Sequence, residues 1–242
     1  MYKSVVDNFS VGVANLLAPQ RCHCCGGATQ RPVCVPCEKS LPWNSRACPH
    51  CATPLVSALA AGHEGPSSNV CGNCLARPPP QDRSWTAFRY EAPVSRQIVA
   101  LKFHGNLMPS HVLGWLMAEK LAARAEPLPD LLIPVPLHHR RLQKRGYNQA
   151  LEIARELSRR LSIPLRADIA RRLKPTREQT ELAAADRRRN VRGVFAVSAA
   201  VASMRIALLD DVITTGATVA ELARTARKAG AAHIEVWAAA RA

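Results

Sequence analysis

The chain has no long hydrophobic run and few aromatic residues. Its 242 residues contain no apolar stretch that approaches the ~18 residues of a membrane-spanning helix. Aromatic side chains make up 5% of the residues, which argues against an extended platform for stacking bases. The motif G-x-x-x-x-G-K-[ST] does not occur, and a P-loop nucleotide site is therefore not expected. The sequence thus predicts neither a membrane span nor these two common binding arrangements.

The beginning of the sequence also lacks a basic leader and a clear cleavage site. Its apolar residues follow Asp7 and fall on one helical face, which predicts a short amphipathic helix packed on the protein. These residues are Val5, Val6, Phe9, Val13, Leu16 and Leu17. No cysteine occurs after residue 74. We expect a reducing, cytoplasmic compartment, in which structural disulfides are rare.

Acidic residues are scarce relative to basic ones. The chain has 33 Lys and Arg against 18 Asp and Glu, a formal net charge of +15. Residues 1–80 hold six basic and three acidic residues, so most of the surplus lies in residues 81–242. This balance favours a polyanionic partner, such as nucleic acid, a phosphorylated small molecule or an anionic membrane surface. The alternative is a solvated Arg-rich surface without such a partner.

The sequence divides into two regions at a proline-rich break, ARPPPQD. We expect a small cysteine-rich domain over residues 1–80 and a larger domain over residues 81–242. In the larger domain, strand and helix patterns alternate. The predicted strands are 85–90, 130–136, 194–197, 205–211 and 233–240; the predicted helices are 94–103, 113–125, 148–161 and 218–230. This alternation predicts an α/β fold with a mostly parallel sheet flanked by helices.

Eight of the nine cysteines form four CxxC pairs. The pairs are Cys22/Cys25, Cys34/Cys37, Cys48/Cys51 and Cys71/Cys74, and Cys24 is left over. Two thiolates at this spacing bind one metal ion from a tight turn, and two pairs complete the four-thiolate site of structural zinc. The sequence therefore predicts about two structural zinc ions. Neighbouring pairs are favoured as partners, and interleaved pairs remain an alternative.

Residues 206–218, IALLDDVITTGAT, place two carboxylates at the end of an apolar strand. Ligands of α/β sheets bind beyond the carboxyl ends of strands. We expect Asp210 and Asp211 to accept hydrogen bonds from sugar hydroxyls. The small residues at the start of the next helix would bind a phosphate through backbone N–H groups. They are Thr214, Thr215, Gly216, Ala217 and Thr218. The predicted ligand contains a ribose 5-phosphate unit.

The same 13 residues resemble the phosphoribosyl pyrophosphate (PRPP) motif of type I phosphoribosyltransferases. Two basic segments are candidates for contacting pyrophosphate. Arg140 and Arg145 follow the strand at 130–136, and Lys174 and Arg187 lie in a charged segment, 174–193, that could close over the ligand. For both segments the alternative is a solvated basic surface.

The four CxxC pairs, together with VPLHHRRLQKRGYNQA at 135–150, resemble the ComF family of competence-related proteins. The family usually has Phe where this chain has Tyr147, and its Gln, Arg, Asn and Phe-x-Val pattern is matched by Gln179, Arg187, Asn190 and Phe195.

The resemblance implies a PRPP site that binds Mg²⁺ with its ligand, with Asp210 and Asp211 as candidate catalytic residues of a transferase whose acceptor is not defined. It also implies a role in DNA uptake, with single-stranded DNA and proteins of the competence machinery as partners. The alternative is a non-catalytic DNA-binding or adaptor protein with a vestigial PRPP site.

Overall fold

The structure, a computed structural model, describes residues 20–55, 69–174 and 191–242. The chain forms two compact units, Met1–Leu41 and Pro42–Ala242. The predicted N-terminal helix and most of the charged 174–193 segment, including Arg187, lie outside the described residues. No helix within the described ranges has the length and apolar character needed to cross a membrane.

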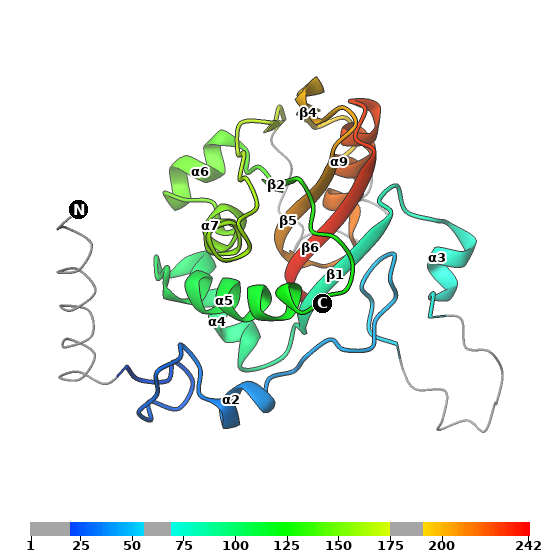
Figure 1. The fold of residues 1–242 in the computed structure, drawn as a ribbon. Coiled ribbons are helices and arrows are strands. Elements are labelled where there is room, and N and C mark those ends of the chain that lie inside the picture. The colour runs from blue at the N-terminus through cyan, green and yellow to red at the C-terminus, as the bar shows by residue number, and fades with distance from the viewer. Residues whose placement is uncertain (1–19, 56–68, 175–190) are drawn as a thin grey trace, which may run out of the picture. The chain divides into compact units, whose positions relative to one another are not determined.

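A four-stranded parallel sheet forms the centre of the larger unit (Figure 1). Its strands are β1 (Arg83–Arg89), β2 (Leu131–Pro134), β5 (Arg205–Ile213) and β6 (His233–Arg241), in the spatial order β1-β6-β5-β2. A separate antiparallel pair consists of β3 (Ala170–Arg172) and β4 (Phe195–Val197). The predicted mostly parallel α/β fold is confirmed. Strands β5 and β6 are buried along nearly their whole length, which explains their continuous apolar sequence.

Helices cover both faces of this sheet. The described helices of the larger unit are α3 (Gly72–Ala76), α4 (Val94–Phe103), α5 (Met108–Ala122), α6 (His139–Arg145), α7 (Gln149–Leu161), η3 (Ala199–Val201) and α9 (Ala217–Lys228). Helix α9 buries Val219 and Leu222 in one core with β5, β6 and the β3–β4 pair. Helices α5 and α7 pack on each other and on the sheet. They approach closely at Gly114, where an added Cβ would lie 2.7 Å from Glu156 Cβ.

Helix α6 lies where the sequence analysis predicts no helix. Residues 139–145, which follow the predicted strand at 130–136, form this helix. His138 begins this helix, because its Nδ1 accepts a hydrogen bond from the N–H of Arg140 at 3.3 Å. Gly146 ends it in the left-handed conformation, with φ of 83°. The helix buries no residue, and its sequence therefore lacks the apolar periodicity that predicts helices.

The outer edge of the sheet at β1 is covered by the segment Pro42–Pro49. The N–H of Arg89 donates to Pro42 O at 2.8 Å, the N–H of Asn44 donates to Ala87 O at 2.9 Å, and the N–H of Ser84 donates to Pro49 O at 2.7 Å. The Trp43 and Phe88 rings pack with their centroids 4.5 Å apart. The stretch that leads into Cys48 is thus part of the sheet structure.

In the smaller unit, the described residues form turns around a short helix, α2 (Val35–Lys39). This helix begins directly after Cys34 and buries no residue. A β-bridge joins Arg21 to Ala28 across the first CxxC turn. With so little apolar burial, this module needs another source of stability.

Candidate functional site

The cysteine sulfurs gather in two groups of four. The groups are Cys22, Cys25, Cys34 and Cys37, and Cys48, Cys51, Cys71 and Cys74. Within each group all sulfur atoms lie within 4.8 Å of one another. The structure thus brings together neighbouring CxxC pairs, not interleaved ones. The first group belongs to the smaller unit and the second to the larger unit.

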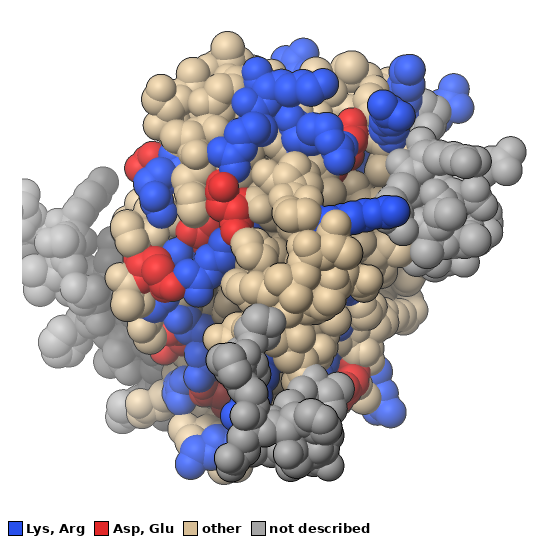
Figure 2. All heavy atoms as spheres, turned by 90° about the vertical axis from the view of Figure 1, so that its right-hand side faces the viewer, with Lys and Arg blue, Asp and Glu red and all other residues tan. Residues whose placement is uncertain are grey.

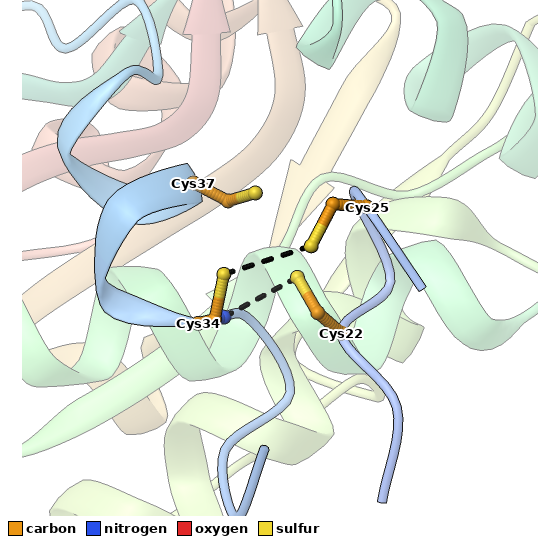
Figure 3. Close-up of side chains that lie close together, drawn as sticks. All are labelled: Cys22, Cys25, Cys34 and Cys37. Atoms are coloured by element: carbon orange, nitrogen blue, oxygen red, sulfur yellow. Dashed lines mark hydrogen bonds between the residues drawn. The ribbon is translucent and has the colours of Figure 1, made fainter. Parts of the chain in front are cut away.

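The spacing of these sulfurs fits a tetrahedral zinc ion. A Zn–S bond of about 2.3 Å places neighbouring sulfurs of a tetrahedron roughly 3.8 Å apart. The Sγ atoms of Cys25 and Cys34 are separated by 3.8 Å (Figure 3), and those of Cys51 and Cys71 by 3.6 Å. Four thiolates leave no open coordination position, so the chemistry of both groups is that of structural zinc.

Backbone N–H groups favour the thiolate form in each group. The N–H of Cys34 points to Cys22 Sγ at 3.3 Å (Figure 3), and the N–H of Cys71 points to Cys48 Sγ at 3.4 Å. Burial raises the pKa of Cys22 and Cys48. The hydrogen bonds from these two N–H groups and from neighbouring backbone N–H groups lower it by more. The pKa of Cys22 falls to about 6 and that of Cys48 to about 7. The thiolate is the form that binds zinc.

Cys24 lies outside both groups of sulfurs. Its side chain is exposed, while its backbone N–H donates to Cys22 Sγ at 3.4 Å. Cys24 therefore contributes to the first group through its backbone.

The second group is joined to the sheet by side-chain hydrogen bonds. Ser84 Oγ donates to His50 O at 2.8 Å. The side-chain amide of Asn44 donates to Ala52 O at 2.8 Å and to Thr86 Oγ1 at 2.7 Å. Ser84 and Thr86 belong to β1, and these bonds fix the turn formed by residues 48–52 on that strand.

The two aspartates lie where the pairing of β5 changes. Strand β2 pairs with β5 up to Pro134, opposite Leu209. Beyond this point β5 continues beside β6, with Asp210 opposite Ala238. The sequence predicted that the strand ends at the aspartates, and the structure extends it to Ile213. Asp210 and Asp211 therefore lie just beyond the end of β2, in the part of β5 that β2 no longer pairs.

Strand alternation directs the two carboxylates to opposite faces of the sheet. Asp211, 8% exposed, pairs with Lys102 of α4 through an Nζ–Oδ2 distance of 2.9 Å. Asp210 is half-buried, and its Oδ1 accepts the N–H of Asp211 at 2.9 Å. Lys102 is a site residue that the sequence analysis missed, because nothing in the α4 sequence signals a partner on β5.

The two carboxylates have different electrostatic environments. Burial and the neighbouring charge of Asp211 raise the pKa of Asp210 to about 7, against the opposing effect of Lys102. Burial lowers the pKa of Lys102, but attraction to Asp211 and Asp210 exceeds that effect and raises it above its ordinary value. The strand end thus holds one ion-paired carboxylate and one that gains a proton near neutral pH.

The 214–218 segment connects β5 to α9. Residues 214–216 form a bend, and the helix begins at Ala217. Thr215 is exposed, and its Oγ1 accepts the N–H of Ala217 at 3.3 Å. Gly216 has φ of 75°, and an added Cβ would meet only Ile213 Cγ2 at 3.8 Å. Glycine is therefore required here for its backbone conformation. The first N–H groups of a helix lack intrahelical acceptors and favour an anion.

The predicted basic residues lie in different surroundings. Arg140 and Lys174 are exposed. Arg145 donates to Gln149 Oε1 at 2.9 Å and lies over the Phe103 ring at 5.6 Å.

One arginine that the sequence analysis did not select, Arg172, interacts with Asp210 at the strand end. Burial and repulsion from Arg141 lower the pKa of Arg172 to about 10, while attraction to Asp210 acts in the opposite direction. Arg172 belongs to β3, whose three residues were too few to predict as a strand. Positive charge therefore faces Asp210 from elements other than β5.

A surface hollow of about 600 Å³ lies elsewhere in the larger unit. It is lined by residues 105–108, 110 and 111 and by four residues of α7, none of them from β5 or the 214–218 segment. Its Glu156 carboxylate already accepts hydrogen bonds from Arg159 and Arg160 and contacts His111. We assign no ligand to this hollow.

Comparison with known proteins gives matches over both regions. Residues 13–75 match the double zinc ribbon domain. Competence protein F of Haemophilus influenzae is 37% identical over 235 residues, which cover 92% of this chain and 97% of that protein. DNA utilization protein YhgH of Escherichia coli strain K12 is 35% identical over 209 residues, 85% of this chain and 88% of that protein.

Solved structures give partial overlaps. The Bacillus subtilis glutamine PRPP amidotransferase complexed with ADP and GMP overlaps 53% of this chain and 25% of its own, with 20% identity and a TM-score of 0.37. Adenine phosphoribosyltransferase from Leishmania tarentolae overlaps 53% of this chain and 54% of its own, with 17% identity and a TM-score of 0.33.

The parallel sheet, its covering helices and the two four-cysteine groups define a zinc-ribbon protein with an α/β domain. The identity to Competence protein F extends over nearly the whole of both chains. The chain belongs to the competence protein F family, and the resemblance stated from the sequence is confirmed.

Proposed function

We propose that this protein binds PRPP, or a related ligand with a ribose 5-phosphate unit, at the carboxyl end of β5. The observation that carries the proposal is the pair of aspartates, beside the end of β2, followed directly by a small-residue bend and a helix N-terminus. The 214–218 segment would hold the 5-phosphate through backbone N–H groups. Asp210 and Asp211 would accept hydrogen bonds from the ribose hydroxyls.

The surrounding charges suit a ligand that carries several phosphates. Lys102 pairs with Asp211 at 2.9 Å and places a positive charge beside it. Arg172 places positive charge near Asp210, where a guanidinium group would bind a diphosphate. Mg²⁺, bound together with PRPP, would neutralise part of the diphosphate charge. The reaction that such a ligand supports is transfer of the ribose 5-phosphate unit to an acceptor.

Calorimetric titration with PRPP and Mg²⁺ tests this site. The double variant Asp210→Asn, Asp211→Asn should lose at least tenfold in affinity while remaining folded and retaining its zinc content. Asp168→Asn is the matched control, because Asp168 pairs with Arg166 on the surface and is not part of β5. Equal PRPP affinity in the wild type, the double variant and the control would reject the site.

For the role in the cell, we propose DNA uptake or DNA utilization. The names of the relatives that match 85% to 92% of this chain support it. Residues 81–242 carry 27 basic and 15 acidic residues. On the face shown in Figure 2, Lys and Arg side chains gather toward the upper edge and outnumber acidic ones. Such a surface attracts the phosphates of nucleic acid.

A second candidate function, binding of single-stranded DNA, is favoured by one surface of the larger unit. Phe103 is 66% exposed, and the guanidinium of Arg145 lies over its ring. Helix α6 adds Arg140 and Lys144, both exposed, beside Arg145. An exposed aromatic ring beside basic side chains is the combination that binds one stacked base and its phosphates.

Fluorescence anisotropy with an oligothymidylate, measured over a range of salt concentrations, tests this surface. Phe103→Ala should weaken binding by about 1–3 kcal/mol and leave the salt slope unchanged. Lys144→Gln should reduce the slope of log affinity against log salt by about 1. Leu75→Ala is the control for loss of an exposed apolar side chain, since Leu75 is 62% exposed on α3. If Phe103→Ala binds as the wild type does, this surface is not the binding site.

A further inference from the structure

The side chain of Arg241, at the end of β6, contacts the second cysteine group. Its Nε donates to Cys51 O at 3.2 Å, and its Nη2 donates to Thr53 Oγ1 at 3.0 Å. Cys51 is one of the four cysteines of that group. One side of the guanidinium thus holds the turn that carries a zinc ligand.

The same guanidinium also holds the start of the 214–218 segment. Its Nη1 donates to Ile213 O at 3.0 Å and also hydrogen-bonds Thr214 O and Ala242 O. Thr214 O is the last carbonyl before Thr215 and Gly216. Because the guanidinium is planar and rigid, its two edges cannot move independently. A displacement of the Cys51 turn is therefore transmitted to the bend.

Charge reinforces this connection. Zinc with four thiolates carries a formal charge of −2. The guanidinium of Arg241 is attracted to the sulfurs of Cys51, Cys71 and Cys74. The side chain is half-buried, so water screens this attraction less than it would on an open surface. A metal-loaded second group would hold Arg241 in place more firmly than four protonated or oxidised thiols would.

We propose that Arg241 is a positioning residue that couples the second zinc site to the 214–218 segment. Zinc bound by Cys48, Cys51, Cys71 and Cys74 would keep the bend in the geometry that binds phosphate. The ligand in this inference rests on the proposed PRPP function, whereas the coupling itself does not. The first cysteine group belongs to the other compact unit and serves as an internal control.

Hydrogen exchange of the amides of residues 213–218 tests the coupling without any ligand. Arg241→Lys keeps the charge and loses the planar fork. It should raise these exchange rates about tenfold while the zinc content and the melting temperature stay near those of the wild type. Thr53→Val is a milder second variant, since it removes one acceptor of Arg241. It should raise the same rates by a smaller factor.

Arg227→Gln is the matched control. Arg227 also donates to backbone carbonyls, those of Ala231 and Ala232, beyond the opposite end of α9. It should leave exchange at residues 213–218 unchanged. Unchanged exchange in Arg241→Lys, or equal changes in Arg241→Lys and Arg227→Gln, would overturn the proposed coupling.

Thermodynamic linkage between zinc binding and ligand binding gives a second measurement. Its result would not change if Arg241 only stabilised the fold. If zinc at the second group favours the binding geometry, the ligand must favour zinc retention by the same factor. PRPP with Mg²⁺ should therefore reduce the equilibrium release of one of the two zinc ions to a competing chelator, which corresponds to a gain in zinc affinity of about tenfold in the wild type. In Arg241→Lys it should have no effect on release. Equal protection in both proteins would overturn the coupling.

The two proposals fail in different ways. If PRPP does not bind the wild type, the proposed function fails, and inorganic pyrophosphate replaces PRPP as the probe in the release assay. Cys71→Ser and Cys34→Ser then complete the hydrogen-exchange test. Faster exchange at residues 213–218 in Cys71→Ser alone supports the coupling. Equal exchange in Cys71→Ser and Cys34→Ser rejects it.

Discussion

The two four-cysteine groups share their CxxC spacing, their sulfur geometry and a backbone N–H donor to the first cysteine, but their surroundings differ. Around the first group, Arg31 and Glu38 form an ion pair within the smaller unit at 2.7 Å. Around the second group, side-chain hydrogen bonds reach β1 and β6 through Ser84, Asn44 and Arg241. The same ligand pattern thus forms a small module in one unit and a constituent of the α/β unit in the other.

The largest expected difference follows from removing equivalent ligands. All four Trp residues lie after residue 41, so tryptophan fluorescence reports only on the larger unit. Cys48→Ser should lose one zinc and lower the free energy of unfolding of that unit by several kcal/mol, out of the 5–15 kcal/mol typical of a domain. Cys22→Ser should also lose one zinc, with an unchanged fluorescence transition. Equal transitions in the two variants would contradict the comparison.

A smaller effect is expected from the hydrogen bonds around each group. Asn44→Ala leaves Ala52 O and Thr86 Oγ1 without their donor in a buried position, which should cost about 1–3 kcal/mol in the fluorescence transition. Ser40→Ala removes an exposed hydrogen bond to Cys37 O. The free energy of zinc binding by the first group should therefore change by less than about 0.5 kcal/mol. A cost for Ser40→Ala as large as that for Asn44→Ala would show that both groups depend equally on such bonds.

A carboxylate in each unit provides a comparison that depends on pH. The raised pKa of Asp210, about 7 against an ordinary 3.8, means that the folded chain keeps a proton that the unfolded chain releases. The contribution of Asp210 to the free energy of unfolding is therefore fully present below about pH 4, and it is lost as the pH rises through 7. Asp210→Asn should raise the melting temperature at pH 8, with a gain that shrinks toward pH 4.

Glu38→Gln is the counterpart in the first unit. Glu38 forms an ion pair with Arg31, and its loss should lower the stability of the zinc module by at most about 1 kcal/mol. Melting curves from pH 4 to 8 measure both variants. A pH-independent gain for Asp210→Asn would show that the carboxylate is ionised throughout this range.

The smallest effect is expected at the ninth cysteine. Cys24→Ser should retain both zinc ions and the wild-type stability, because the Cys24 sulfur lies outside the group of four and the backbone N–H that donates to Cys22 Sγ is kept. Cys25→Ser, one residue further along, should lose one zinc. Metal analysis of both variants, purified under reducing conditions, measures how many zinc ions each one retains. Loss of zinc in Cys24→Ser would place this thiol among the ligands.

The sequence predicted most of the fold because its core elements have strong periodicity. The predicted helix 94–103 matches α4, and the strands at 205–211 and 233–240 match β5 and β6 to within two residues. Helix α6 escaped prediction because it buries nothing and its stability comes from a His cap and a Gly end. The CxxC spacing indicated the cysteine grouping, since each pair is local in sequence.

The remaining site residues depend on contacts between distant parts of the chain. Lys102 meets Asp211 from another element, and Arg241 is separated from Cys51 by 190 positions. A lone basic residue in a helix or at a strand end carries no local signal of such a partner. The hydrogen bonds that join the second cysteine group to β1 could not be predicted for the same reason, because no single motif contains both Ser84 and His50.

The segment that covers β1 leads into the second cysteine group. Zinc bound at that group should therefore affect how the protein behaves in concentrated solution. The segment Pro42–Pro49 occupies the N–H and C=O groups along the free edge of the sheet, and it leads directly into the 48–52 turn. Loss of that metal would loosen the segment and expose an unpaired strand edge, which is a template for pairing with another molecule. Depletion of zinc would then be followed by aggregation through β1, with Trp43 and Phe88 adding exposed aromatic surface.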